Sequence, residues 1–76
     1  MVPRYHLHLV SCDQPIIDFD GIEADGDHDV CAGALEVISE VRADPEQYAK
    51  WRDWHIEIVE DTGRIVVTIP FAPLTH

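Results

Sequence analysis

The chain has 76 residues, of which 15 are acidic and five are basic, so its formal charge at neutral pH is −10. Such a charge repels a phosphate backbone and argues against nucleic-acid partners, while no apolar run approaches the roughly 20 residues that a membrane helix needs. We therefore expect one domain over residues 1–76 without a membrane partner, and, because the N-terminus does not resemble a secretion signal, a cytoplasmic location.

The first predicted element is a strand over residues 4–10, where Tyr5, Leu7 and Leu9 alternate with His6, His8 and Val10. Side chains in a strand point to opposite faces with a period of two, so each set of three should share one face. Turn residues at 13–15 then precede a short apolar segment, 16–19. This segment predicts a brief returning strand.

A helix is predicted over roughly residues 29–43. Six apolar residues recur there at helical spacing and make one stripe: Val30, Ala34, Leu35, Val37, Ile38 and Val41. Aspartates crowd the start of this helix, where the helix dipole favours negative charge and a carboxylate can cap free N–H groups.

A second, shorter helix is predicted near residues 45–52. Pro45 disfavours a helical conformation at Asp44, so the main helix should stop there. Asp44 can then cap the new helix, with Pro45 at its first position.

The clearest pattern in the chain is a β-hairpin, in which residues 54–59 and 64–71 alternate apolar and polar side chains around a turn at 60–63. A four-residue turn would pair Ile58 with Ile65, Ile56 with Val67 and Trp54 with Ile69, all on one face. The predicted fold class is therefore α+β in the order β-β-α-β-β. One main helix packs on one face of a small antiparallel sheet.

Three groups of residues resemble a family of short bacterial proteins catalogued as a domain of unknown function. They are Pro3-Arg4-Tyr5 with His8-Leu9 on the first strand, Asp18-x-x-Gly21-x-Glu23 before the helix, and Asp61-x-Gly63-Arg64 with Thr68-x-Pro70-Phe71 at the end. The similarity spans nearly the whole chain. It implies a small α+β domain in the bacterial cytoplasm, and it assigns no activity, cofactor or catalytic residue.

The first candidate site is a histidine face. His6 and His8 project from one side of the first strand, and His55 and Glu57 project from the same side of the first hairpin strand. If these two strands are neighbours, three imidazoles and a carboxylate could bind a divalent metal such as Zn²⁺. The alternative is a polar sheet face that binds no metal.

The second candidate site is the side of the sheet that a single helix leaves open. Val10, Val59 and Val66 should lie there, and an open face or edge suits self-association or docking of a protein partner. No catalytic or cofactor-binding residue is assigned, so a non-catalytic interaction module, such as a homodimer, is favoured over an enzyme. Two alternatives stay open: a metal-binding protein or enzyme that uses His6, His8 and His55, and an antitoxin-like regulatory module.

Overall fold

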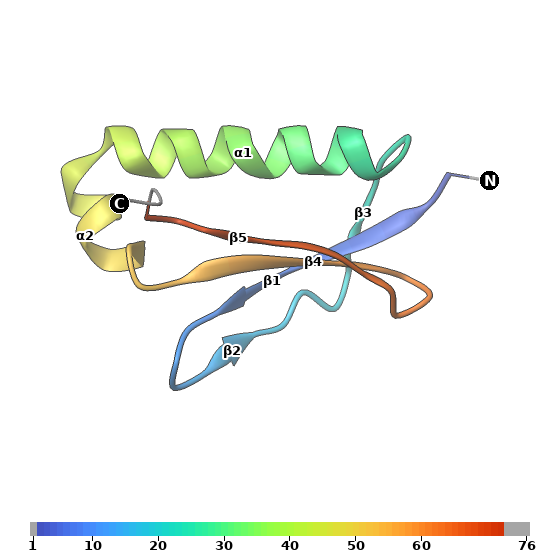
Figure 1. Cartoon of the computed structure of the whole chain (residues 1–76), viewed down its shortest axis with the longest axis horizontal. Coiled ribbons are helices and arrows are strands. Elements are labelled where there is room, and N and C mark those ends of the chain that lie inside the picture. Colours follow the sequence, from blue (N-terminus) through green and yellow to red (C-terminus); the bar gives the residue numbers. More distant parts are fainter. Residues whose placement is uncertain (1, 73–76) are drawn as a thin grey trace.

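The computed structural model describes residues 2–72, in which one antiparallel sheet lies beneath a long helix (Figure 1). The elements are β1 (Arg4–Val10), β2 (Pro15–Ile16), β3 (Ile22–Glu23), α1 (Asp27–Ala43), α2 (Pro45–Trp51), β4 (His55–Glu60) and β5 (Ile65–Pro70). The predicted α+β class is confirmed. Within residues 2–72, neither helix combines the length and the apolarity that a membrane crossing requires.

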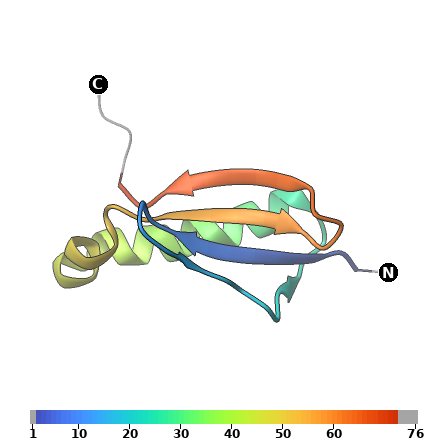
Figure 2. The ribbon, with the colours of Figure 1, turned by 90° about the horizontal axis from the view of Figure 1, so that it is seen from below.

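The sheet has the strand order β2-β1-β4-β5, and β3 also pairs with β1. Residues 5–10 of β1 pair antiparallel with β4, which brings the start of the chain against the hairpin. The other edge of β1 is shared by two short strands, because Leu9 pairs with Ile16 and Tyr5 pairs with Ile22. The predicted returning strand at 16–19 is thus replaced by two strands, and their connection runs beside β1 (Figure 2).

One face of α1 covers the sheet. Val30, Ala34 and Ile38 lie on successive turns and are 2%, 0% and 1% exposed, and they pack in one cluster with Ile56 and Ile58 of β4. The buried stripe is narrower than the sequence predicted. Two further residues at helical spacing flank it and are about half exposed, namely Leu35 and Val37.

The start of α1 also differs from the prediction. The helix begins at Asp27 rather than near Asp29, and its N-cap is Gly26, which makes no side-chain capping bond. The Asp29 carboxylate instead accepts the N–H of Asp25 at 3.1 Å, on the loop before the helix. The predicted capping by an aspartate is therefore wrong. The expected excess of negative charge in the first turn is present, where it favours the helix dipole.

The second helix follows the prediction closely. Asp44 has an extended backbone, and its carboxylate accepts the N–H of Glu46 at 3.0 Å, while Pro45 occupies the first turn. An aromatic cluster closes the core at this end of the molecule. Trp51 lies 5.1 Å from Trp54 and 6.1 Å from Phe71 between ring centroids, and Phe71 is 3% exposed.

The predicted register of the hairpin is wrong. Ile58 pairs with Val67 rather than with Ile65, and Ile65 pairs with Val59. Gly63, at φ 96°, closes a tighter turn in which its N–H donates to the carbonyl of Glu60 at 2.8 Å. The strands therefore pair closer to the turn than a four-residue loop would allow, and an irregularity next to Val59 shifts the register again.

This irregularity changes the face on which two side chains lie. Ile65 shares a face with Val59, on the side away from α1, and is 62% exposed. Val66, which the sequence placed on the open side, is half-buried and packs against the core. The hydrophobic pattern alone did not reveal this exchange, because both residues are β-branched and apolar.

Candidate functional site

Figure 2 looks onto the side of the sheet that α1 does not cover, which we call the outer face. Directly paired residues of a sheet share a face, so the pairing of β1, β4 and β5 arranges these side chains in rows. The rows are His6 with Val59 and Ile65, His8 with Glu57 and Thr68, and Val10 with His55 and Pro70.

The centre of the outer face carries little charge for so acidic a chain. Glu57 is the one carboxylate in the three rows of β1, β4 and β5, while Glu23, opposite Arg4, and Asp61, beside His6, lie at the margin. The helix side is different, because α1 alone carries Asp27, Asp29, Glu36 and Glu40. A face with few charges can approach another protein surface with less repulsion and a smaller desolvation cost.

The structure fulfils the condition that the metal prediction set, because β1 and β4 are neighbours. His8 lies directly opposite Glu57, whereas His55 lies one row further along, opposite Val10. Among residues 2–72, no group of three or more His, Cys, Asp or Glu side chains is placed to hold a metal ion. The metal site stays a prediction, which a thermal melt with and without Zn²⁺ would check.

Asp18 connects the two histidines of β1 to the segment between β2 and β3. His6 Nδ1 lies 2.8 Å from the Asp18 carbonyl oxygen, and the Asp18 N–H donates to His8 Nδ1 at 3.1 Å. The imidazole rings are nearly parallel, with centroids 6.1 Å apart. We call His6, His8 and Asp18 the histidine clasp, since together they hold residues 17–21 beside β1.

The Asp18 carboxylate strengthens the same attachment. It accepts the N–H of Leu7 at 3.1 Å and the N–H of Gly21 at 3.0 Å. The hydrogen bond from Gly21, followed by the one from Leu7, lowers the pKa of Asp18, because both bonds favour the charged carboxylate. Asp18 thus accepts the backbone N–H of Leu7 in β1, which neither β2 nor β3 pairs with.

His6 also contacts the hairpin turn. Its Nε2 lies 3.1 Å from the carboxylate of Asp61, and its side chain is 18% exposed. The bond to Asp61, followed by the bond to the Asp18 carbonyl, raises the pKa of His6. Since a carbonyl and a carboxylate are both acceptors, the imidazolium form, which donates from both nitrogens, fits this position best.

A second network joins the opposite face of the same end of the sheet to α1. The Tyr5 hydroxyl donates to Asp27 Oδ1 at 2.8 Å, and Arg64 Nη2 donates to the same oxygen at 2.9 Å. Arg64 also bonds to Glu60 at 3.3 Å. Burial and then the bond to Asp27 raise the pKa of Tyr5 to about 12, while Arg64 lowers the pKa of Asp27 and of Glu60.

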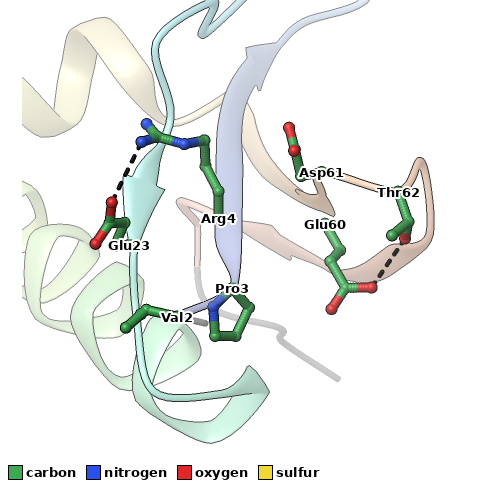
Figure 3. A pocket seen from close by; sticks show the side chains of 7 residues that line it. All are labelled: Val2, Pro3, Arg4, Glu23, Glu60, Asp61 and Thr62. Atoms are coloured by element: carbon green, nitrogen blue, oxygen red, sulfur yellow. Dashed lines mark hydrogen bonds and ion pairs between the residues drawn. The ribbon is translucent and has the colours of Figure 1, made fainter.

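An open cleft of about 450 Å³ lies between these two networks (Figure 3). Its lining comes from the chain start, β3 and the hairpin turn: Val2, Pro3, Arg4, Glu23, Glu60, Asp61 and Thr62. Figure 3 shows Arg4 reaching Glu23, at 3.3 Å, and Glu60 reaching the Thr62 hydroxyl, at 2.9 Å. These polar groups satisfy one another, so the cleft is better suited to holding the strands together than to binding a charged ligand.

Large apolar side chains are exposed on the segment that the clasp holds. Phe19 is 86% exposed and Ile17 is 42% exposed, and they flank Asp18 in the chain. The clasp histidines project from the outer face, so this segment forms a rim of that face. This exposure was not predicted, because residues 16–19 were expected to form a strand. The turn pattern Asp18-x-x-Gly21 was the available signal.

The predicted interaction residues are divided between the two faces. Val10 and Val59 lie on the outer face and are half-buried. Val66 packs against the core, and Ile65 takes its place beside Val59. The apolar part of the outer face is therefore Val10, Val59 and Ile65, extended at the rim by Ile17 and Phe19.

The sequence model of the family described as "Domain of unknown function (DUF6894)" matches residues 4–72, nearly the whole chain. The chain belongs to this family. No match was found among curated proteins or among solved structures. The description of the DUF6894 family names no activity, so any function has to be argued from the site itself.

The motifs on which the predicted resemblance was based hold the fold together. Arg4 pairs with Glu23 across β1 and β3, and Asp18 accepts the N–H of Gly21. Asp61 binds His6, while its own N–H donates to the carbonyl of Arg4 at 2.9 Å. In this DUF6894 chain, these motifs fasten the edge segment and the hairpin turn to β1. None of them forms an arrangement typical of a catalytic centre.

Proposed function

We propose that this chain is a non-catalytic self-association module, in which the outer faces of two copies pack together. The observation that supports this proposal is the distribution of charge. The chain has a net charge of −10, yet the three central rows of the outer face contain one carboxylate beside Val10, Val59 and Ile65. The carboxylates of Glu23 and Asp61 lie at the margin of this face and are paired with Arg4 and His6. Two copies that approach by this face avoid the repulsion that their acidic helix sides would produce.

The size of the face predicts a weak dimer. β1, β4 and β5 have six or seven residues each, and β2 and β3 add two residues each at the edge of β1. At a strand spacing of about 4.8 Å and roughly 3.3 Å per residue, they present a face of about 350 Å². Stable complexes bury about 800 Å² per partner. The rim residues Ile17 and Phe19 would add to the buried area, but the total remains small for a stable complex. We therefore expect the dimer to dissociate on dilution. A bacterial cytoplasm as the setting is part of this proposal and is supported only by the resemblance.

Two matched substitutions test the proposal. Ile65 is 62% exposed on the outer face and Leu35 is 53% exposed on α1, so Ile65→Glu and Leu35→Glu add the same charge to different surfaces at little cost to folding. Sedimentation equilibrium over a range of protein concentrations should show a monomer–dimer equilibrium in the parent chain and in Leu35→Glu. Ile65→Glu should remain a monomer.

A parent chain that stays monomeric at every concentration would remove the proposal. Equal weakening of association by both substitutions would show that net charge, rather than the outer face, determines the result. Binding of a different protein to this face is the remaining possibility, and it would leave the isolated chain monomeric.

A further inference from the structure

We propose that the second copy docks about a two-fold axis that runs along the strands between β1 and β4, so that Phe19 of each copy packs on Ile65 of the other. This inference rests on the proposed function, because it concerns the same dimer through the outer face. It adds the orientation of the two copies and the side chains that anchor them.

An exposed apolar side chain lies at each edge of the outer face. Among residues 2–72, Phe19 and Ile65 have the most exposed large apolar side chains, at 86% and 62%. Ile65 lies on β5, and Phe19 lies at the opposite edge, on the segment between β2 and β3 (Figure 2). Both lie at the level of His6 along the strands, because Ile65 shares its row and the carbonyl of Asp18, which precedes Phe19, contacts its ring.

A two-fold axis along the strands exchanges these two edges. Two copies of one face meet as an isologous pair, in which each contact occurs twice. The strand order β2-β1-β4-β5 places the middle of the face between β1 and β4. An axis there sets β1 over β4 of the other copy and β5 over its edge segment. Because this axis keeps each residue at its level along the strands, Phe19 meets Ile65 in both directions.

The usual rotation between packed sheets leaves this contact in place. The strands of two sheets that pack face to face differ in direction by about 30°. An edge that lies one and a half strand spacings from the axis, or about 7 Å, is then displaced by about 4 Å along the strands. This displacement is about one residue, which the side chains of Phe19 and Ile65 are long enough to span.

The position of Glu57 favours this axis over one that runs across the strands. Glu57 is the one carboxylate in the three central rows, and it lies in the middle row, opposite His8. An axis across the strands would set the two copies of Glu57 against each other, and facing like charges repel. The axis along the strands sets Glu57 over His8 of the other copy instead. Nδ1 of His8 accepts the N–H of Asp18, which leaves Nε2 as the ring nitrogen that can donate to this carboxylate.

Phe19 also supplies contact area that the strands lack. The strands present a face of about 350 Å² in each copy, and an aromatic side chain buries about 150–250 Å². Phe19 therefore enlarges the contact of each copy by about half. Since the contact occurs twice, a change at either of its two positions should weaken the dimer strongly.

An exchange of charge across the contact tests this arrangement. Phe19→Lys and Ile65→Glu change exposed side chains, so both variants should fold, which circular dichroism checks. Each variant alone should have a dimer dissociation constant at least about tenfold above that of the parent chain, because both copies of the apolar contact are lost. In an equimolar mixture a lysine faces a glutamate in one contact, and the other contact is unchanged. Sedimentation equilibrium should therefore show a heterodimer.

An equimolar mixture of Phe19→Glu and Ile65→Glu is the matched control. It changes the same two positions but sets two carboxylates against each other, so it should form no heterodimer. A second measurement uses the parent chain and depends on no variant. In a mixture of isotope-labelled and unlabelled copies, nuclear Overhauser effects should connect the Phe19 ring of one copy with the Ile65 methyl groups of the other.

The other outcomes separate the arrangement from the dimer itself. A parent chain that dimerises without this Overhauser effect overturns the arrangement while the proposed function stands. Failure of Phe19→Lys to associate with Ile65→Glu, or equal association in both mixtures, has the same consequence. A parent chain that is monomeric at every concentration overturns the proposed function and the arrangement together.

Discussion

Gly21 is the position at which the packing of the edge segment against β1 can be tested most sharply. Its φ is +74°, and a Cβ built there would lie 2.8 Å from the backbone oxygen of Tyr5 in β1. Two other glycines provide controls. Gly63 has φ +96° with no atom within 4 Å of such a Cβ, and Gly33 lies in α1 with similarly open space.

The three glycine-to-alanine substitutions should therefore form a graded series. A left-handed backbone costs a non-glycine residue about 1–2 kcal/mol, which is the whole effect expected for Gly63→Ala. Gly21→Ala adds a collision with a strand carbonyl, for which overpacking costs about 1–3 kcal/mol, so the total is about 2–5 kcal/mol. Gly33→Ala should stabilise the chain by about 0.5–1 kcal/mol, because alanine is the better helix former.

Urea denaturation followed by the fluorescence of Trp51 and Trp54 would measure the series. A domain of this size has a total stability of roughly 4–11 kcal/mol, so Gly21→Ala should move the midpoint far more than Gly63→Ala does. If the two variants lose equal stability, or if Gly21→Ala loses less, residues 17–21 do not pack against β1 as described, and the basis of the clasp fails with them.

The same urea assay and its pH dependence test the remaining expectations. Ile38→Ala, at a site 1% exposed, should cost about 2–5 kcal/mol, whereas Leu35→Ala, at a site 53% exposed, should stay within about 0.5 kcal/mol. Similar costs at both sites would contradict the assignment of the buried face of α1. Phe71→Ala should cost about 3–5 kcal/mol and Phe71→Leu clearly less, because leucine keeps part of the apolar volume of a ring that is 3% exposed; equal losses would contradict the attribution of this cost to buried apolar volume. The raised pKa of His6 stabilises the folded state. This contribution to the free energy of unfolding is complete below the ordinary pKa of 6.5 and is lost as the pH rises through the raised value. The free energy of unfolding of His6→Gln should therefore not show this decrease with rising pH. The lowered pKa of Asp18 acts in the other direction. Its contribution to the free energy of unfolding is present above the ordinary pKa of 3.8 and is lost as the pH falls through the lowered value. The free energy of unfolding of Asp18→Asn should not show this loss at acid pH.

Local patterns in the sequence were sufficient for the two helices, β1 and the two hairpin strands, but not for β2 and β3. The apolar spacing from Val30 to Ile38 predicted the main helix, and the pair Asp44-Pro45 predicted both its end and the cap of α2. These features depend on residues within a few positions of one another. Period-two alternation likewise predicted β1 and both strands of the hairpin.

The features that failed depend on contacts between distant parts of the chain or on the detail of a turn. The hairpin register followed from the backbone of Gly63 and from an irregularity that no hydrophobic pattern encodes. The outer-face position of His6 and His8 was predicted, but their partner Asp18 lies 10–12 residues away on a segment without regular structure. The exposure of Phe19 was missed because the turn pattern Asp18-x-x-Gly21 on this segment was interpreted as the end of a strand.

The central claim is that two copies meet through the outer face, and a dilution series followed by amide chemical shifts tests it most directly. Shifts that depend on concentration should map to Glu57, Val59 and Ile65 and to the rim at Phe19, while the amides of Leu35 and Val37 on α1 stay constant. Shifts that do not change with concentration, or that change on α1 instead, would contradict the claim.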